Sequence, residues 1–390
     1  MDKKISGFPE LDAWAREAYA QRENELGYPG NQDIQLRAFY EWYIANGLES
    51  ACMNNAGDPF NEHPSAMSSQ RFEREVLEFF APLYGFKPGD FWGLVTNCGT
   101  DGNNHGIYFG ASHLRCKTGR EPIFYVSDEA HYSNMRLAHL QNFEVRLVKS
   151  DDMGRMIPEE LERVLNPDRP CLIVYAMGST FKGAIDNQKA LNAVLTKYPK
   201  MEVYRHVDAA LFGGYLPFTE FKDMVSQEKM GFQSISISGH KFFGTGDPAG
   251  IFLTTRDIYD SQDHFNIAYI NQDMKMISCS RSATAPLKYW WLIKHIGKEG
   301  WEQQAKALLC NTEHLKERFA QIGYPHWAND LSNTVFFKRP TAHIVEKYHL
   351  AGSYDERFGG ELSHMVVMQH ATRERIDAFV DALAKEGQTE

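Results

Sequence analysis

Seven short strand-like segments, separated by loops and helical patterns, constrain the fold of this chain more than any other feature. They are Phe91 to Thr96, Pro122 to Val126, Glu144 to Val148, Cys171 to Ala176, Glu202 to Val207, Ser234 to Ser238 and Gly250 to Thr254. Strands that alternate with helices are typical of a mainly parallel sheet with helices on both faces. We therefore predict an α/β fold for this part of the chain.

The regions on either side follow other patterns. The first 60 residues contain two helical candidates, Glu10 to Arg22 and Ile34 to Asn46. Beyond residue 285, long helical patterns and two further strands predict a smaller α+β domain. The predicted organisation is an N-terminal helical segment, a large domain and a small C-terminal domain, over residues 1–60, 61–285 and 286–390.

The composition favours an enzyme that acts on small molecules. A net charge of −10 and a pI near 5.9 predict neither a nucleic-acid partner nor an anionic membrane surface. The six cysteines lack metal-binding spacing, so we expect reduced thiols and no metal site. Residues 1–7 lack the apolar segment of a secretory signal, and the longest apolar runs are only strand-sized. We therefore expect a cytoplasmic protein.

The strand Ser234 to Ser238 leads directly to a lysine. Serines and isoleucines alternate along it, which predicts a half-buried strand, and Gly239, His240 and Lys241 follow. Ligands bind at the carboxyl ends of parallel strands. A lysine that is partly desolvated there has a lowered pKa and can form an imine. Taken alone, a surface lysine is the commoner interpretation.

Other predicted strand ends carry complementary groups. Asp208 follows a strand, and its carboxylate could pair with a protonated ring nitrogen, while the small side chain of Ala210 leaves space for a flat ring. Gly99 and Thr100 open a helix whose free amides suit a phosphate. His131 could stack on a ring or shuttle protons. Each of these groups also has an ordinary structural interpretation, because it could belong to a turn, a helix cap or a loop that contains a histidine.

Together these groups match the needs of one cofactor. The hydroxyls of Ser179 and Thr180 could serve a phenolic oxygen or a carboxylate. A lysine for an imine, an acid for a ring nitrogen, amides for a phosphate and a ring to cover one face are the requirements of pyridoxal 5′-phosphate. The sequence therefore predicts a pyridoxal-phosphate site.

The chain resembles the group II pyridoxal-phosphate-dependent amino-acid decarboxylases, most of all the bacterial histidine decarboxylases and plant serine decarboxylases. The matching motifs run in order along the chain from about residue 50 to residue 380. They include Gly57-Asp58, Phe72-Glu73-Arg74-Glu75, Thr96-Asn97, Gly99-Thr100-Asp101-Gly102-Asn103, His131-Tyr132-Ser133, Gly178 with Thr180, Gly183-Ala184-Ile185-Asp186, His206 with Asp208-Ala209-Ala210-Leu211, Ser236 to Lys241, Ser280-Arg281 and Thr334-Val335-Phe336.

The resemblance implies the aspartate-aminotransferase type I fold, with a mainly parallel seven-stranded sheet, and a homodimer with active sites at the subunit interface. Lys241 would form the internal aldimine, His131 would stack on the pyridine ring, and Asp208 would pair with the ring nitrogen. Residues 269–282 would close the neighbour's site. The other residues implied to hold the cofactor are Gly99, Thr100, Thr180, Ala210, Ser238 and His240.

The sequence departs from the family pattern near the presumed substrate. The altered segments are residues 61–67, 244–249 and 279–284. Candidate substrate contacts are Glu62, His63, Asp247, Tyr269 and Arg281, and the first three could suit a cationic or polar side chain. Tyr269 is also a candidate proton donor to the α-carbon, although a core tyrosine would explain it equally well.

Three functions stay open at this point. The first is decarboxylation of an L-amino acid, histidine first, to its amine through a Lys241 aldimine and a quinonoid. The second is another pyridoxal-phosphate reaction, such as transamination, decarboxylation-coupled oxidation or carbon–carbon bond formation. The third is cofactor binding without catalysis, or a role as a regulatory partner of an active homologue. Release of CO₂ with the simple amine would distinguish the first.

Overall fold

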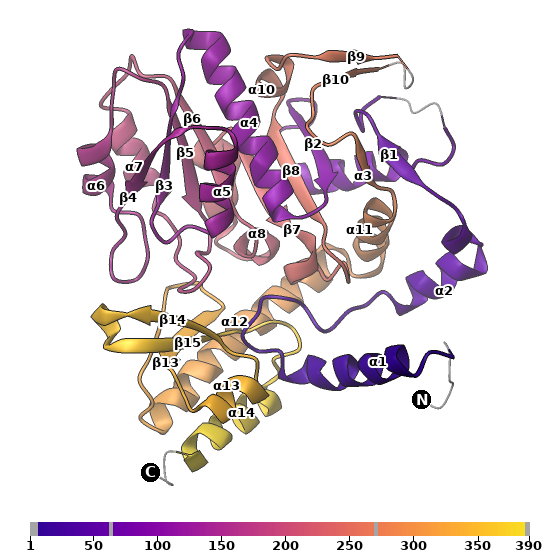
Figure 1. The fold of residues 1–390 in the computed structure, drawn as a ribbon, viewed down its shortest axis with the longest axis vertical. Helices are drawn as coiled ribbons and strands as arrows, with labels where there is room; N and C mark the ends of the chain where they lie inside the picture. Colours follow the sequence, from indigo (N-terminus) through magenta and orange to yellow (C-terminus); the bar gives the residue numbers. More distant parts are fainter. Residues whose placement is uncertain (1–6, 62–64, 269–271, 387–390) are drawn as a thin grey trace. The chain divides into compact units, whose positions relative to one another are not determined.

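The computed structural model of the protein describes residues 7–61, 65–268 and 272–386 (Figure 1). Contacts divide the chain into two compact units. The larger comprises Ile34–Lys306, and the smaller joins the N-terminal segment up to Asp33 to the C-terminal segment from Ala307. The domain boundaries that we predict at residues 60 and 285 stay a prediction.

The larger unit is built on a seven-stranded sheet, as predicted. Its strands, in spatial order, are β2 (Phe91–Thr96), β8 (Gly250–Thr255), β7 (Ser234–Ser238), β6 (Val203–Asp208), β5 (Cys171–Ala176), β3 (Ile123–Ser127) and β4 (Glu144–Val148). The five strands from β7 to β4 run parallel to one another, whereas β8 runs antiparallel to both β7 and β2. A loop of residues 239–249 joins β7 to β8, which is too short for the crossover that a parallel pair needs.

Helices cover both faces of this sheet (Figure 1). On the face of the β7 serines lies α4, and on the face of the β7 isoleucines lies α8. The helices of the larger unit are α2 (Arg37–Ala45), α3 (Gln70–Phe80), α4 (Gly99–Thr118), α5 (Tyr132–Leu140), α6 (Pro158–Val164), α7 (Gln188–Leu195), α8 (Phe212–Tyr215), α9 (Gln227–Met230), α10 (Arg256–Asp260) and α11 (Thr284–His295). Short antiparallel pairs are formed by β1 (Asn54–Ala56) with β11 (Ser280–Ser282) and by β9 (Phe265–Ile267) with β10 (Gln272–Met274).

Four glycines let α4 lie very close to the sheet. Gly99, Gly102, Gly106 and Gly110 are three or four residues apart, so they share one face of the helix. A methyl group on any of them would overlap a side chain of β6 or β7. The side chains that fill this space are Ser238, Ser236, His206 and Tyr204, in that order along the helix.

The smaller unit contains a four-stranded antiparallel sheet. Its strands, in spatial order, are β12 (His326–Ala328), β13 (Thr334–Lys338), β15 (Gly360–Val366) and β14 (Ala351–Asp355). Its helices include α1 (Pro9–Gln21), α13 (Ala342–Lys347) and α14 (Arg373–Glu386), and α12 (Gly297–Gln321) runs across the division between the units. Buried Phe319, Phe337 and Phe379 lie at the centre of its core. The smaller C-terminal α+β region that we predict is confirmed, although β12 and β14 were not predicted.

No helix within the described ranges is long and apolar enough to cross a membrane. All six cysteines are free thiols.

We predict that Gly106→Ala lowers the free energy of unfolding by about 1–3 kcal/mol, because the added methyl group would overlap the buried ring of His206. Chemical denaturation of the purified protein measures this. The control is Gly30→Ala, whose methyl group would meet only the end of the Gln32 side chain at 3.5 Å, and which should stay within about 0.5 kcal/mol of the wild type. Equal effects at the two positions would contradict the close packing of α4.

Candidate active site

Lys241 lies in a tight turn directly after β7. The turn, Gly239–Phe243, is a single π-helical turn in which Lys241 departs from helical geometry, with φ −82° and ψ −110°. Burial lowers the pKa of Lys241, and the negative charge of Asp208 partly offsets this effect. A lysine with a lowered pKa holds more of its amine in the neutral, nucleophilic form. The prediction that this strand is half-buried is wrong. Strand β7 is buried on both faces, because α4 covers the serine face.

Asp208 is a buried carboxylate at the end of β6, the strand next to β7. Its Oδ2 accepts hydrogen bonds from the side-chain amides of Asn103, at 2.8 Å, and Asn134, at 3.0 Å. Its Oδ1 accepts only a long bond of 3.3 Å from the backbone of Ala210 among the interactions that the structure describes. A charge of this kind is costly to bury without donors, and two amides supply them.

Sequence analysis missed both amides. Asn103 lies in a motif shared with the family and Asn134 is three residues after His131, but neither position indicates that its side chain turns toward Asp208. The contact arises because α4 and α5 bring their first turns to the same strand end.

His131 caps the N-terminus of α5. Its Nδ1 accepts hydrogen bonds from the hydroxyl of Ser133, at 2.7 Å, and from the backbone N–H of Ser133, at 3.3 Å. Burial lowers the pKa of His131, Asp208 opposes that shift and Lys241 adds to it. A neutral imidazole whose Nδ1 accepts must carry its proton on Nε2. The ring is therefore held in one tautomer.

An anion cradle lies at the start of α4. The backbone of Gly99 packs against the hydroxyl of Ser238 and the methyl group of Ala210, and the next residue, Thr100, is exposed. The Nδ1 atom of His240 is buried and has no hydrogen-bond partner among the described residues. Free helix amides, hydroxyls and a ring nitrogen without a partner suit a phosphate. The buried Nδ1 of His240 could be satisfied by a ligand at this site.

Thr180 is exposed in the turn that follows β5, beside β6. The turn begins at Gly178, whose φ of 98° suits glycine, and a methyl group there would overlap the ring of Phe212. The predicted cofactor residues thus gather at the carboxyl ends of β5, β6 and β7 and at the helix starts beside them.

The structure does not test the predicted substrate contacts in the same way. Glu62, His63 and Tyr269 lie outside the described residues. The exposed carboxylate of Asp247 forms an ion pair of 2.6 Å with Lys288, which offsets its charge. As contacts to a substrate, these residues stay predictions.

Arg281 forms a buried ion pair with Glu73. Each N–O distance is 3.1 Å, both side chains are almost fully buried, and Arg281 also donates to the carbonyl of Gly57 at 3.0 Å. The Glu73 carboxylate accepts further bonds from Val95 N–H and from Asn55, so the pair ties β11 to β1, β2 and α3. Its contacts are thus to the protein, and its predicted contact with a substrate stays a prediction.

The residues present fit pyridoxal phosphate, since they combine a desolvated lysine, a buried acid, a neutral histidine and an anion cradle. Residues 112–332 match the family model described as the pyridoxal-dependent decarboxylase conserved domain. Serine decarboxylase 1 of Oryza sativa subsp. japonica is 32% identical, over 97% of this chain and 76% of that protein. Histidine decarboxylase of Solanum lycopersicum is also 32% identical, over 98% of this chain and 91% of that protein.

The chain belongs to the pyridoxal-dependent decarboxylase family. Solved structures agree on the fold: that of the L-methionine decarboxylase of Streptomyces sp. 590 has a TM-score of 0.82 at 20% identity, over 96% of this chain and 94% of that one. The type I fold, the cofactor and the enzyme class that the resemblance implies are confirmed. This decarboxylase is a carboxy-lyase whose cofactor is pyridoxal phosphate.

The Glu73–Arg281 pair leads to a prediction about stability. Arg281→Met should lower the free energy of unfolding of this decarboxylase by about 3–5 kcal/mol, because the carboxylate of Glu73 is left buried without its partner. Chemical denaturation without cofactor measures this.

A matched control is Arg115→Ala, which breaks an exposed ion pair with Glu121 and should cost less than about 1 kcal/mol. If the Arg281→Met protein were as stable as the wild type and lost only affinity for its amino acid, Arg281 would be a substrate contact.

Proposed function

We propose that this decarboxylase converts an L-amino acid with a polar side chain, histidine first, to its amine at the site of Lys241, Asp208 and His131. The observation that carries the proposal is the pair of a buried carboxylate at the end of β6 and a desolvated lysine at the end of the neighbouring strand β7. Histidine comes first because a histidine decarboxylase is among the relatives that match most of the chain.

Each residue has a distinct task in this proposal. Bound pyridoxal phosphate supplies an aldehyde for amines and a conjugated ring that accepts the electron pair left when CO₂ departs. The amine of Lys241, whose pKa is lowered by burial, would hold the cofactor. Asp208 Oδ1, which has few other contacts, would accept a hydrogen bond from the protonated ring nitrogen. His131 would cover one face of the ring, with its own proton on Nε2.

The phosphate end is held by the start of α4. Gly99 and Thr100 would supply backbone amides and a hydroxyl, Ser238 a second hydroxyl, and His240 the nitrogen that lacks a partner. Thr180 would lie near the phenolic oxygen and Ala210 beneath the ring.

The substrate side supports a polar rather than a strongly cationic side chain. Asp247 adds a carboxylate to the loop after Lys241, but Lys288 offsets its charge. Glu62, His63 and Tyr269 remain proposed contacts from the sequence. A cytoplasmic location also stays a prediction.

We expect Lys241→Ala to abolish CO₂ release from every amino acid in a panel that includes histidine and serine. Reduction with borohydride, digestion and mass spectrometry should find the reduced cofactor on the peptide of Lys241 in the wild type only. The control Lys197→Ala, at an exposed lysine paired with Glu162, should keep both properties.

The panel also tests the reaction type. Stoichiometric CO₂ with the simple amine is the expected product. A keto acid, an aldehyde or a larger condensation product would favour another pyridoxal-phosphate reaction. Full activity of the Lys241→Ala protein would contradict the assignment of Lys241 to the active site.

We also propose a homodimer with shared active sites. Helix α1 has no buried residue, and its Leu11, Trp14 and Tyr19 are all more than half exposed. A 13-residue helix is marginal in water unless its apolar side chains are covered. A second copy of this chain is the partner that the proposal assigns to this helix.

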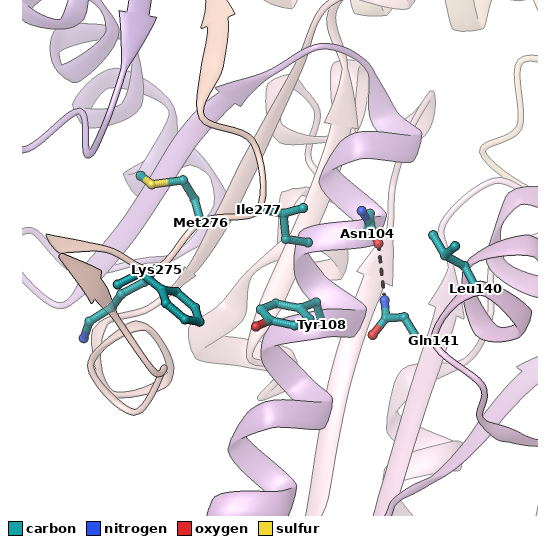
Figure 2. Close-up of a pocket in the computed structure, with 8 residues that line it drawn as sticks. Asn104, Tyr108, Leu140, Gln141, Lys275, Met276 and Ile277 are labelled. Atoms are coloured by element: carbon teal, nitrogen blue, oxygen red, sulfur yellow. Dashed lines mark hydrogen bonds between the residues drawn. The ribbon is translucent and has the colours of Figure 1, made fainter. Parts of the chain in front are cut away.

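The larger unit supports the same proposal. A hollow of about 430 Å³ lies between α4, α5 and the segment after β10. Figure 2 shows the residues that line it: Asn104 and Tyr108 of α4, Leu140 at the end of α5 with Gln141 after it, and Lys275, Met276 and Ile277. Leu140, Phe265 and Ile277, which line the hollow, are exposed apolar side chains. Burial against a second copy would remove these apolar side chains from water.

The segment 272–282 lies against the helix that carries the anion cradle. The backbone N–H of Ile277 donates to His105 Nε2 at 3.2 Å, and the Ser278 hydroxyl donates to Asp101 at 3.2 Å. These bonds hold the segment near the start of α4, which supports the proposal that residues 269–282 help to close a neighbouring site.

We predict that Leu140→Glu combined with Ile277→Glu converts the dimer to monomers and lowers activity, because charged side chains cannot be buried there without partners. Light scattering after size-exclusion chromatography measures the mass. The control Tyr354→Glu, at an exposed residue of β14, should stay dimeric. A monomeric wild type would contradict the proposal.

A further inference from the structure

Several buried polar side chains near Asp208 lie in the space between α4 and the sheet. His206 Nε2 is 3.0 Å from Asn103 Oδ1, and His206 Nδ1 is 2.7 Å from the Ser234 hydroxyl. The hydroxyl of Tyr204 donates to Ser234 Oγ at 2.8 Å. All five side chains are almost fully buried. We call Asp208, Asn103, His206 and Ser234 the Asp208 network.

The charge of Asp208 sets the direction of each hydrogen bond in this network. A carboxylate only accepts, so Asn103 must point its amide nitrogen at Asp208 and its oxygen at His206. That oxygen needs a donor, so His206 carries its proton on Nε2. Its Nδ1 must then accept from Ser234, whose own oxygen is free to accept from Tyr204.

His206 is suited to this arrangement because it stays neutral and cannot turn. Burial lowers the pKa of His206 to about 4, although the charge of Asp208 opposes the shift. The ring occupies the space that the missing side chain of Gly106 leaves in α4. A neutral, immobile imidazole with one donor and one acceptor keeps the amide of Asn103 from flipping.

We propose that His206 is a positioning residue for the cofactor: through Asn103 it directs amide donors to Asp208 Oδ2 and leaves Oδ1 to bind the protonated ring nitrogen of pyridoxal phosphate. This rests on the proposed function. Without the His206 donor, the Asn103 amide can turn its oxygen toward the carboxylate, and the contact of Asp208 with the ring nitrogen weakens. The proposed effect of the Asp208 network is limited to the contact with the ring nitrogen and does not extend to any other part of the cofactor.

The test compares two cofactors in apoenzyme variants. One is pyridoxal phosphate, and the other is its 1-deaza analogue, in which carbon replaces the ring nitrogen. His206→Phe removes both hydrogen bonds of the ring, Ser234→Ala removes the donor to Nδ1, and His206→Gln retains an amide donor for Asn103. Dissociation constants are measured by equilibrium dialysis, and thermal unfolding of each apoenzyme reports whether it is folded.

We expect His206→Phe and Ser234→Ala to weaken pyridoxal phosphate binding about tenfold, the equivalent of one buried hydrogen bond to a charged group. His206→Gln should restore most of the affinity. Binding of the deaza analogue should change by less than about twofold in every variant. The control Tyr175→Phe, on β5, removes a buried hydroxyl that donates to Asn192 of α7, and it should change neither affinity.

The outcomes separate the alternatives. Equal weakening of both cofactors would show a general structural effect and overturn the proposal, as would unchanged affinity in both His206→Phe and Ser234→Ala. If the His206→Phe protein does not fold, the cofactor affinities of Ser234→Ala are compared with those of the Tyr175→Phe control, and this comparison tests the proposal. Failure of the proposed function has a different signature, since the wild type would then not carry the cofactor on Lys241.

Discussion

A carboxylate buried at the end of a strand needs hydrogen-bond donors, and much of the larger unit follows from how Asp208 obtains them. Donors come from Asn103 on α4 and Asn134 on α5. Both helices must therefore begin close to the end of β6. For α4 this closeness depends on a row of glycines, where any larger residue would overlap the serines of β7 or the aromatic rings of β6. The close packing of α4 against the sheet thus brings a donor to Asp208, positions the anion cradle and sets the direction of the helix.

The same packing explains why the interior of this unit is polar as well as apolar. Apolar residues such as Trp92, Phe109 and Phe252 form the core on the α4 face of the sheet. Ser234, Ser236, Asn103 and His206 lie in the narrow space under the glycines, and each has a hydrogen-bond partner there. A fully satisfied polar network resists rotation of its members more than an apolar contact does. It is therefore a suitable support for a charge that must stay in place.

The two halves of the site are built differently. The residues proposed to hold the cofactor lie at strand ends and in the first turns of helices. The segments proposed to contact the substrate include Arg281 and Asp247, which form ion pairs with Glu73 and Lys288. Under this proposal, changes in such segments would alter which side chain is accepted and leave the chemistry of the cofactor intact. This is consistent with a family whose members share a cofactor and differ in substrate.

The sequence alone determined the alternation of strands and helices, the lysine after β7 and the acid at the end of β6, because these depend on local periodicity and on motifs of adjacent residues. It did not reveal that both faces of β7 are buried, or that Asn103, Asn134 and His206 serve Asp208. Those side chains come from separate segments of the chain, and nothing local records which way they turn. Only the close approach of α4 and α5 to the sheet brings them together, and that approach is a property of the tertiary structure.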